Sequence, residues 1–266
     1  MKNMKNENAE TQAVILEGLI SVMAVLESDN RHIQSIWVDK NKQYAKKYKS
    51  NKPIYAKLIE TAHKMNIPLE FVPAEHINKY THGKTGGGVI AFASQRQYMA
   101  VSELVNLNPN GKWAALEGFE DPYNYGYAIR ALYAAGFDGL ITSRENWGGA
   151  DTLVIKASAG ASEKMPTALL SDYNQTIDVL HQNNVSIICA HRNDRCVSLY
   201  DAEIKPPYLI IVGGEKRGIA KEFINAADKL VVIPYGGKVD FALPGVSAVT
   251  IIAFELLRRE SIYTTN

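Results

Sequence analysis

From Lys112 onward, short apolar runs that predict strands alternate with segments of helical periodicity. Runs such as Tyr208–Val212 are apolar at every position, which predicts a sheet buried on both faces. The expected strands cover residues 113–117, 138–142, 185–190, 208–213 and 229–233. The expected helices cover residues 125–135, 166–170, 173–181, 219–226 and 246–259. This alternation predicts an α/β domain built on a mostly parallel sheet.

A smaller α/β pattern precedes this domain. Helices are expected at residues 11–27, 54–65 and 76–80, and strands at 33–38, 69–72 and 86–93. The pattern predicts a small α/β domain of roughly a hundred residues. Residues 96–110 are rich in turn formers, which favours a linker. We therefore expect a first domain over 1–98, a linker over 99–111 and a second domain over 112–266.

Charge is unevenly distributed along a chain whose net charge is only +1. Residues 1–100 hold 14 Lys and Arg against 9 Asp and Glu, whereas the remainder holds 15 against 19. The excess indicates that the first part meets an anionic partner. Its densest stretch, residues 40–57, has seven lysines, no acid and three tyrosines that could stack on bases. The alternative for a lysine run is a solvated helix surface.

Composition excludes several classes of protein. No apolar run is long enough for a membrane span, and the N-terminus lacks an apolar signal core, so we expect a soluble chain. Cys189 and Cys196 have neither a metal nor a redox spacing, which favours a reduced, cytoplasmic protein. No His, Cys and Asp cluster has metal-ligand spacing, so no metal is expected. The Gly-x-Gly-x-x-Gly signature of dinucleotide enzymes is absent after the first strand of the second domain.

Three motifs lie where strands of the second domain end. The first is Asp121-Pro-x-Asn124-x-Gly-x-x-x-Arg130, which follows the strand at 113–117. The second is the turn Gly213-Gly-Glu215-Lys-Arg-Gly218. The third is Ile233-Pro234, followed by a loop and a long apolar helix. Because ligands of open α/β sheets bind at the carboxyl ends of the strands, these motifs predict one site.

In this order, the motifs resemble those of the SpoU/TrmH-type RNA 2′-O-ribose methyltransferases, a branch of the SPOUT superfamily. The stretch Ser158-Ala-Gly-Ala161 is similar to a further family element, and residues 1–98 resemble the family's substrate-binding domain, which is related to a ribosomal-protein fold. The resemblance implies a deep trefoil knot that holds S-adenosylmethionine. It also implies methylation of a ribose 2′-hydroxyl, with rRNA favoured over tRNA, and a homodimer formed through the C-terminal domain.

The resemblance assigns roles to individual residues. Arg130 would lie by the target hydroxyl and bind the adjacent phosphate, Asn124 would orient the loop or substrate, and Glu215 would accept a hydrogen bond or hold a loop. The residues implied to line the cofactor pocket are Val212, Gly213, Ile233, Pro234, Leu243 and Ser247. The residues expected to contact RNA are Lys46, Lys47, Lys49, Lys84 and Arg96. The apolar positions expected at the dimer interface are Val246, Val249, Ile252, Ala253 and Leu256.

The third motif departs from the family pattern Ser-Leu-Asn-Val-Ser. Here the chain reads Ala242-Leu-Pro-Gly-Val-Ser247. Either Pro244 stands where the family has Asn, or the register slips and Ser247 serves as the second serine. One polar group expected in the site is missing. This keeps open an RNA-binding protein of the same fold with weak or lost catalysis. A tRNA-directed enzyme and a base-nitrogen methyltransferase also remain alternatives.

Overall fold

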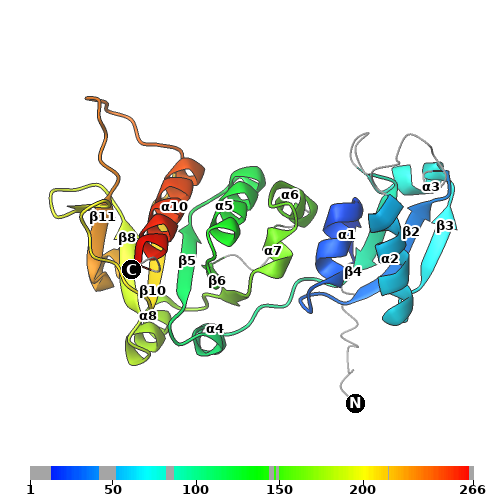
Figure 1. Cartoon of the computed structure of the whole chain (residues 1–266), viewed down its shortest axis with the longest axis horizontal. Helices are drawn as coiled ribbons and strands as arrows, with labels where there is room; N and C mark the ends of the chain where they lie inside the picture. Colours follow the sequence, from blue (N-terminus) through cyan, green and yellow to red (C-terminus); the bar gives the residue numbers. More distant parts are fainter. Residues whose placement is uncertain are drawn as a thin grey trace, which may run out of the picture. The chain divides into compact units, whose positions relative to one another are not determined.

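The fold is described from a computed structural model, which covers residues 13–41, 52–81, 87–143, 147, 150–214 and 216–263. The chain divides into two units, Met1–Gln97 and Tyr98–Asn266. Each unit has its own sheet, and each is described by itself below (Figure 1).

The first unit has a four-stranded sheet in the order β1-β4-β2-β3. Strand β4 is antiparallel to β1 and β2, and β3 is parallel to β2. The strands are β1 (Val14–Glu17), β2 (Ile33–Asp39), β3 (Leu69–Val72) and β4 (Val89–Ala93). The helices are α1 (Leu19–Leu26), α2 (Lys52–Lys64) and α3 (Ala74–Asn78).

The prediction of one helix over residues 11–27 is wrong. The apolar residues of β1 pair with β4 instead, and α1 begins only after Gly18. Gly18 has a φ of 89° and donates its N–H to the carbonyl of Val89 at 2.9 Å. A backbone at this φ favours glycine, so Gly18 lets the chain leave the sheet and start the helix.

The second unit has a seven-stranded sheet in the order β7-β6-β5-β10-β8-β11-β9, and all its neighbouring strands are parallel. The strands are β5 (Lys112–Glu117), β6 (Gly139–Thr142), β7 (Thr167–Leu169), β8 (Ser186–Ala190), β9 (Val197–Ser198), β10 (Tyr208–Gly213) and β11 (Lys229–Val232). The helices are α4 (Val101–Leu107), α5 (Pro122–Ala134), α6 (Asp151–Ala157), α7 (Ala161–Lys164), α8 (Tyr173–Gln182), α9 (Lys221–Ala226) and α10 (Gly245–Tyr263). The expected α/β fold with a mostly parallel sheet is confirmed.

Both faces of this sheet are covered, as the apolar runs predict. On one face α5 and α10 lie side by side, and Ile129 and Leu256 pack with Leu116 of β5 (Figure 1). On the other face, α4, α8 and α9 contribute a second cluster that includes Leu180 and Phe223. The sheet is therefore the middle of three layers, and the ligands of such folds bind at the strand ends.

Two segments of the second unit differ from the prediction. Residues 167–169 form β7 and not part of a helix, because the segment pairs with β6 and three residues are too few for a helical turn with its own hydrogen bonds. The expected linker contains α4, whose Val101, Leu104 and Val105 are buried in the second cluster. Their spacing of three and four residues places them on one helix face. Strand β9 and helices α6 and α7 were not expected.

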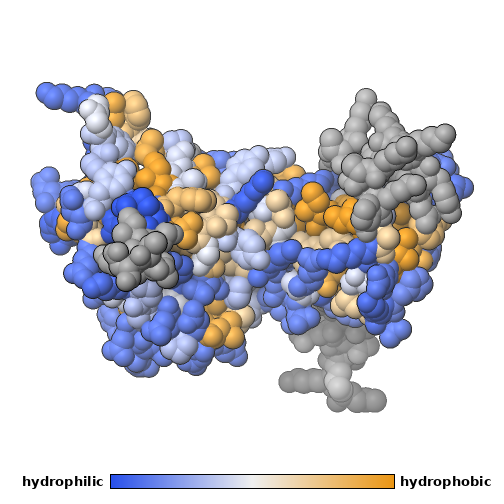
Figure 2. Space-filling view, in the orientation of Figure 1, coloured by the Kyte–Doolittle hydropathy of each residue, from blue (hydrophilic) through white to orange (hydrophobic). Residues whose placement is uncertain are grey.

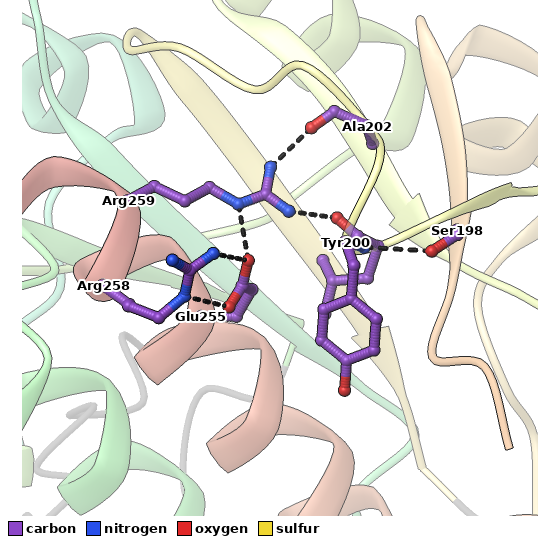
Figure 3. A network of polar contacts seen from close by, with 7 residues as sticks. Ser198, Tyr200, Ala202, Glu255, Arg258 and Arg259 are labelled. Atoms are coloured by element: carbon purple, nitrogen blue, oxygen red, sulfur yellow. Dashed lines mark hydrogen bonds and ion pairs between the residues drawn. The ribbon is translucent and has the colours of Figure 1, made fainter. Parts of the chain in front are cut away.

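A polar network ties the end of α10 to the edge of the sheet (Figure 3). Glu255 accepts hydrogen bonds from Arg258 and from Arg259 Nε, each at 2.8 Å. Arg259 also donates to the carbonyls of Leu199 and Ala202, which follow β9. The hydrogen bonds from Arg258, with those from Arg259 and the charges of both, lower the pKa of Glu255 to about 2.

No described helix has the length and apolar character needed to cross a membrane. Among the same residues, no group of three or more His, Cys, Asp and Glu side chains could hold a metal ion.

We predict that Glu255→Gln lowers the free energy of unfolding by about 1–2 kcal/mol at pH 7, because hydrogen bonds to a charged group are lost. The folded pKa of about 2 lies below the unfolded value of about 4.3. The carboxylate therefore stabilises the fold above the unfolded pKa and loses this effect as pH falls through the folded pKa. Denaturant unfolding should show the difference between parent and variant shrinking from about pH 5 to pH 2. Asp178→Asn, at an exposed carboxylate of α8, is the control.

Candidate functional site

The candidate site lies where β5, β10, β8 and β11 end. These four strands are neighbours and parallel, so the loops that follow them meet at one edge of the sheet. The chain leaves β5 through Gly118, β8 through His191, β10 through Gly214 and β11 through Ile233. The three motifs found in the sequence are thus brought together, although 82 residues lie between Arg130 of the first and Gly213 of the second.

Two glycine turns touch at the centre of this edge. The N–H of Gly214 donates to the carbonyl of Glu117 at 2.6 Å. A Cβ atom on Gly214 would lie 2.3 Å from the carbonyl oxygen of Gly118, and one on Gly213 would lie 2.9 Å from Gly218 Cα. Only glycine permits such an approach of backbone to backbone. The turns therefore leave room at the strand ends that side chains would otherwise fill.

A cavity of about 210 Å³ opens beside these turns. Four of the predicted cofactor residues line it: Val212, Gly213, Ile233 and Leu243. Pro234 lines a wider opening of about 770 Å³ next to it, whereas Ser247 lines neither. Further lining residues were not predicted, among them Ala190, His191, Arg192, Gly214, Gly218, Ile219, Tyr235, Ala242, Gly245 and Ala248. His191 and Arg192 could have been predicted from the sequence, because they come directly after a buried strand.

A second cavity, of about 140 Å³, shares Gly214 and Gly245 with the first. It is lined by Asn124 and by Asp121, which caps α5 by accepting the backbone N–H groups of Tyr123 at 3.1 Å and Asn124 at 3.3 Å. This cap fixes the first turn of α5. Asn124, half-buried, is thereby held beside the glycine turns, as predicted from its place after the strand.

Arg130 lies apart from both cavities. It is exposed on α5, six residues beyond Asn124, which is roughly 9 Å along the helix axis. Its guanidinium makes no hydrogen bond or ion pair with a described residue. The structure thus leaves Arg130 available to an external anion but does not place it in the cavity that Asn124 lines. Glu215 lies outside the described residues.

A carboxyl group that the sequence reasoning missed lies beneath the site. Glu117 ends β5, is only 5% exposed and accepts a hydrogen bond from Tyr173 Oη at 3.0 Å. Burial raises the pKa of Glu117, while hydrogen bonds from Tyr173 and Ser143 oppose the rise. Burial and the nearby carboxyl group of Glu117 raise the pKa of Tyr173 to about 12. Glu117 could have been predicted from the sequence, because it is an acidic residue at the end of an apolar strand.

The predicted RNA contacts are only partly within the described residues. Lys46, Lys47, Lys49 and Lys84 lie outside them. Arg96 is 9% exposed, so its side chain offers little surface to an RNA. It lies three residues beyond the end of β4 and is buried in the first unit.

Four of the five residues predicted to form a dimer interface are buried within the chain, whereas Val246 is half-buried. Val249, Ile252, Ala253 and Leu256 are at most 3% exposed and pack in the cluster formed with α5. Their periodicity marks the inner face of α10, so this part of the prediction is wrong. The exposed aromatic residues of these helices are Phe254 of α10 and Tyr123, Tyr127 and Tyr133 of α5. Hydrophobic residues gather over α10 on the face seen in Figure 2.

The second unit is thus an α/β fold with a glycine-lined cavity at the carboxyl edge of a parallel sheet, where such folds bind their ligands. Residues 113–242 match the SpoU rRNA methylase family, and residues 15–99 match the RNA 2′-O-ribose methyltransferase substrate-binding family. The chain therefore belongs to the SpoU family of RNA methyltransferases.

Individual relatives agree with this assignment. An uncharacterised tRNA/rRNA methyltransferase of Synechocystis sp. is 24% identical over 96% of this chain, which spans 65% of that relative's length. The 23S rRNA (guanosine-2′-O-)-methyltransferase RlmB of Ralstonia nicotianae is 26% identical over 95% of this chain and 98% of its own. The AdoMet complex of the SpoU methyltransferase AviRb from Streptomyces viridochromogenes shares the fold, with a TM-score of 0.77 and 16% identity over 97% of this chain and 94% of that chain.

We predict that Gly214→Ala destabilises the second unit by about 1–3 kcal/mol, because the added Cβ meets the rigid backbone of Gly118 at 2.3 Å. Gly236→Ala is the matched control, since a Cβ there meets nothing within 4 Å. Denaturant unfolding of both variants measures the effect. Equal stability of the two variants would show that the glycine contact is not a constraint.

Proposed function

We propose that this protein transfers the methyl group of S-adenosylmethionine to a ribose 2′-hydroxyl of RNA. The observation that carries the proposal is the pair of adjoining cavities at the sheet edge, one lined by glycine turns and the other by Asn124. They lie in a chain that matches the family's catalytic and substrate-binding regions alike.

The residues that line the larger of the two cavities fit this cofactor. Aliphatic side chains such as Val212, Ile219 and Leu243 suit the adenosyl group, while the glycine turns let the ligand lie against backbone N–H and carbonyl groups. The resemblance implies that the cofactor is held largely through backbone atoms, so the missing Asn of the third motif would remove little of the pocket. The relative AviRb was solved with AdoMet, which supports the same choice.

The chain's own residues act on the RNA. The cofactor supplies an electrophilic methyl group, but a ribose hydroxyl is a poor nucleophile, so it must be placed in line and shielded from water. Asn124 positions the substrate at the head of α5. Arg130 binds the adjacent phosphate and lowers the pKa of the hydroxyl electrostatically, since an arginine that stays protonated is a poor base. To Glu215 we assign the role that the resemblance implies, which is to accept a hydrogen bond or hold a loop.

Ribosomal RNA is the substrate that we favour over tRNA, with action in the cytoplasm. RlmB relatives are described as acting on 23S rRNA, and their similarity extends over nearly the whole chain. The first unit, with its excess of basic residues, would hold the RNA through phosphates, including those met by Lys46, Lys47, Lys49 and Lys84.

Two features of architecture belong to the proposal. The first is the trefoil knot, in which the segment after β11 would thread an earlier loop; the meeting of the loops after β8, β10 and β11 supports it. The second is a homodimer through α5 and α10. Tyr127 and Arg130 are three residues apart and both exposed, so a partner covering Tyr127 would lie beside Arg130.

Incubation with methyl-labelled S-adenosylmethionine and total RNA tests the function. We expect label in 2′-O-methylated nucleosides of rRNA by mass spectrometry. Label in tRNA or on a base nitrogen would identify one of the rival enzymes. RNA binding without cofactor binding or transfer would identify a non-catalytic protein of the same fold.

Arg130→Ala is expected to reduce methyl transfer about 100-fold, the usual scale for losing one positioned charge in the transition state. Cofactor affinity should stay near that of the parent, because Arg130 lines neither cavity. Transfer rates and isothermal calorimetry measure the two effects. Arg130→Lys, which keeps the charge, should recover part of the rate, and a folded Arg130→Ala protein with poor cofactor binding would contradict the assigned role.

Light scattering tests the dimer. The parent should have twice the chain mass of 29.4 kDa at micromolar concentration. The double variant Tyr127→Glu/Phe254→Glu should be a monomer, because charges are costly to bury in an interface. Phe71→Glu changes an equally exposed aromatic residue of the first unit and should leave the dimer intact.

A further inference from the structure

The loop over residues 236–243, between β11 and α10, has little apolar packing of its own. Phe241 is 61% exposed, Pro244 is exposed, and a Cβ on Gly236 would meet nothing within 4 Å. Yet Ala242 and Leu243 form a wall of the 210 Å³ cavity, and Val239 and Asp240 line the wider opening beside it. Polar contacts must therefore hold the loop in this position.

One set of contacts comes from Arg192, two residues beyond β8. Its guanidinium donates to the carbonyl of Phe241 at 3.3 Å and to that of Val239 at 3.4 Å. The same group lies 5.2 Å from the centre of the Tyr235 ring. A forked cation is suited to bind two carbonyls of one loop and an aromatic face at once.

The other contact comes from Tyr235, three residues beyond β11. Its hydroxyl accepts the backbone N–H of Leu243 at 3.0 Å. Strands β8 and β11 are neighbours, and the N–H of His191 donates to the carbonyl of Val231 at 2.9 Å. Arg192 and Tyr235 therefore start from adjacent points of the sheet and contact neighbouring parts of the same loop, Arg192 its middle and Tyr235 its end at Leu243.

We infer that Arg192 and Tyr235 are positioning residues that hold loop 236–243 against the sheet edge and so form the cofactor pocket of this chain. The inference rests on the proposed function. One polar group expected in the third motif is missing here, where Pro244 stands in place of Asn or the register slips, and this sequence leaves the loop with contacts from Arg192 after β8 and Tyr235 after β11.

Hydrogen exchange and cofactor binding test the inference with Tyr235→Phe and Arg192→Gln. Tyr235→Phe removes the acceptor but keeps the ring, so the Leu243 amide should exchange roughly threefold to tenfold faster in the cofactor-free protein. Both variants should raise the Kd and KM for S-adenosylmethionine by a similar factor, with a smaller effect on kcat. The double variant should lose less affinity for S-adenosylmethionine than the sum of the two single losses, because both residues act on one loop.

Three controls separate positioning from other roles. Tyr200→Phe and Arg195→Gln change an exposed tyrosine and an exposed arginine that do not contact loop 236–243. Both variants should behave as the parent does. Arg192→Lys keeps the charge without the fork; recovery of affinity by Lys would show direct charge contact with the ligand and overturn the inference.

Unchanged exchange at Leu243 in Tyr235→Phe, or faster exchange with unchanged affinity, would also overturn it. If the parent binds no S-adenosylmethionine, the proposed function fails by itself. The exchange rates then still decide whether Arg192 and Tyr235 hold the loop.

Discussion

The site depends on the contact between two backbones, that of Gly118 after β5 and that of Gly214 after β10. The Gly214 N–H reaches the Glu117 carbonyl at 2.6 Å, and no Cβ fits between the two turns. Because the strands are parallel neighbours, this contact fixes the first and second motifs against each other. The head of α5, the glycine turn and the start of α10 can then surround one space.

Packing of α5 and α10 explains why that space stays open. Gly126 lets α5 approach α6 so closely that a Cβ there would lie 2.6 Å from Ala157 Cβ. On the neighbouring helix, the inner face of α10 fills the core, and Glu255 with its two arginines anchors the helix end near β9. The helix start, at Gly245, is left against Phe119 and the glycine turns, where a larger residue would close the cavity.

The sequence was sufficient for the strands of the second unit, because unbroken apolar runs such as Tyr208–Val212 occur mainly in buried parallel strands. It was also sufficient to predict that Asn124 and the glycine turn lie at the sheet edge, because both belong to short motifs that follow strands. It failed for β7, where three residues become a strand only by pairing with β6. The inner face of α10 was interpreted as a dimer interface. Periodicity shows that one face of a helix is covered, but it does not show whether the same chain or a partner covers it.

Arg192 and Tyr235 show a different limit of sequence reasoning. Arg192 lies outside the three motifs and Tyr235 lies in the loop of the third, and the common role that we infer for them depends on β8 and β11 being neighbours. A pocket formed by backbone groups tolerates changes of side chain as long as the loop that carries those groups is held in place. The departure at Pro244 therefore bears on what holds the loop more than on what touches the cofactor. In such a site, a polar residue lost from a motif can be replaced by contacts from another strand, which keeps the geometry while changing the sequence.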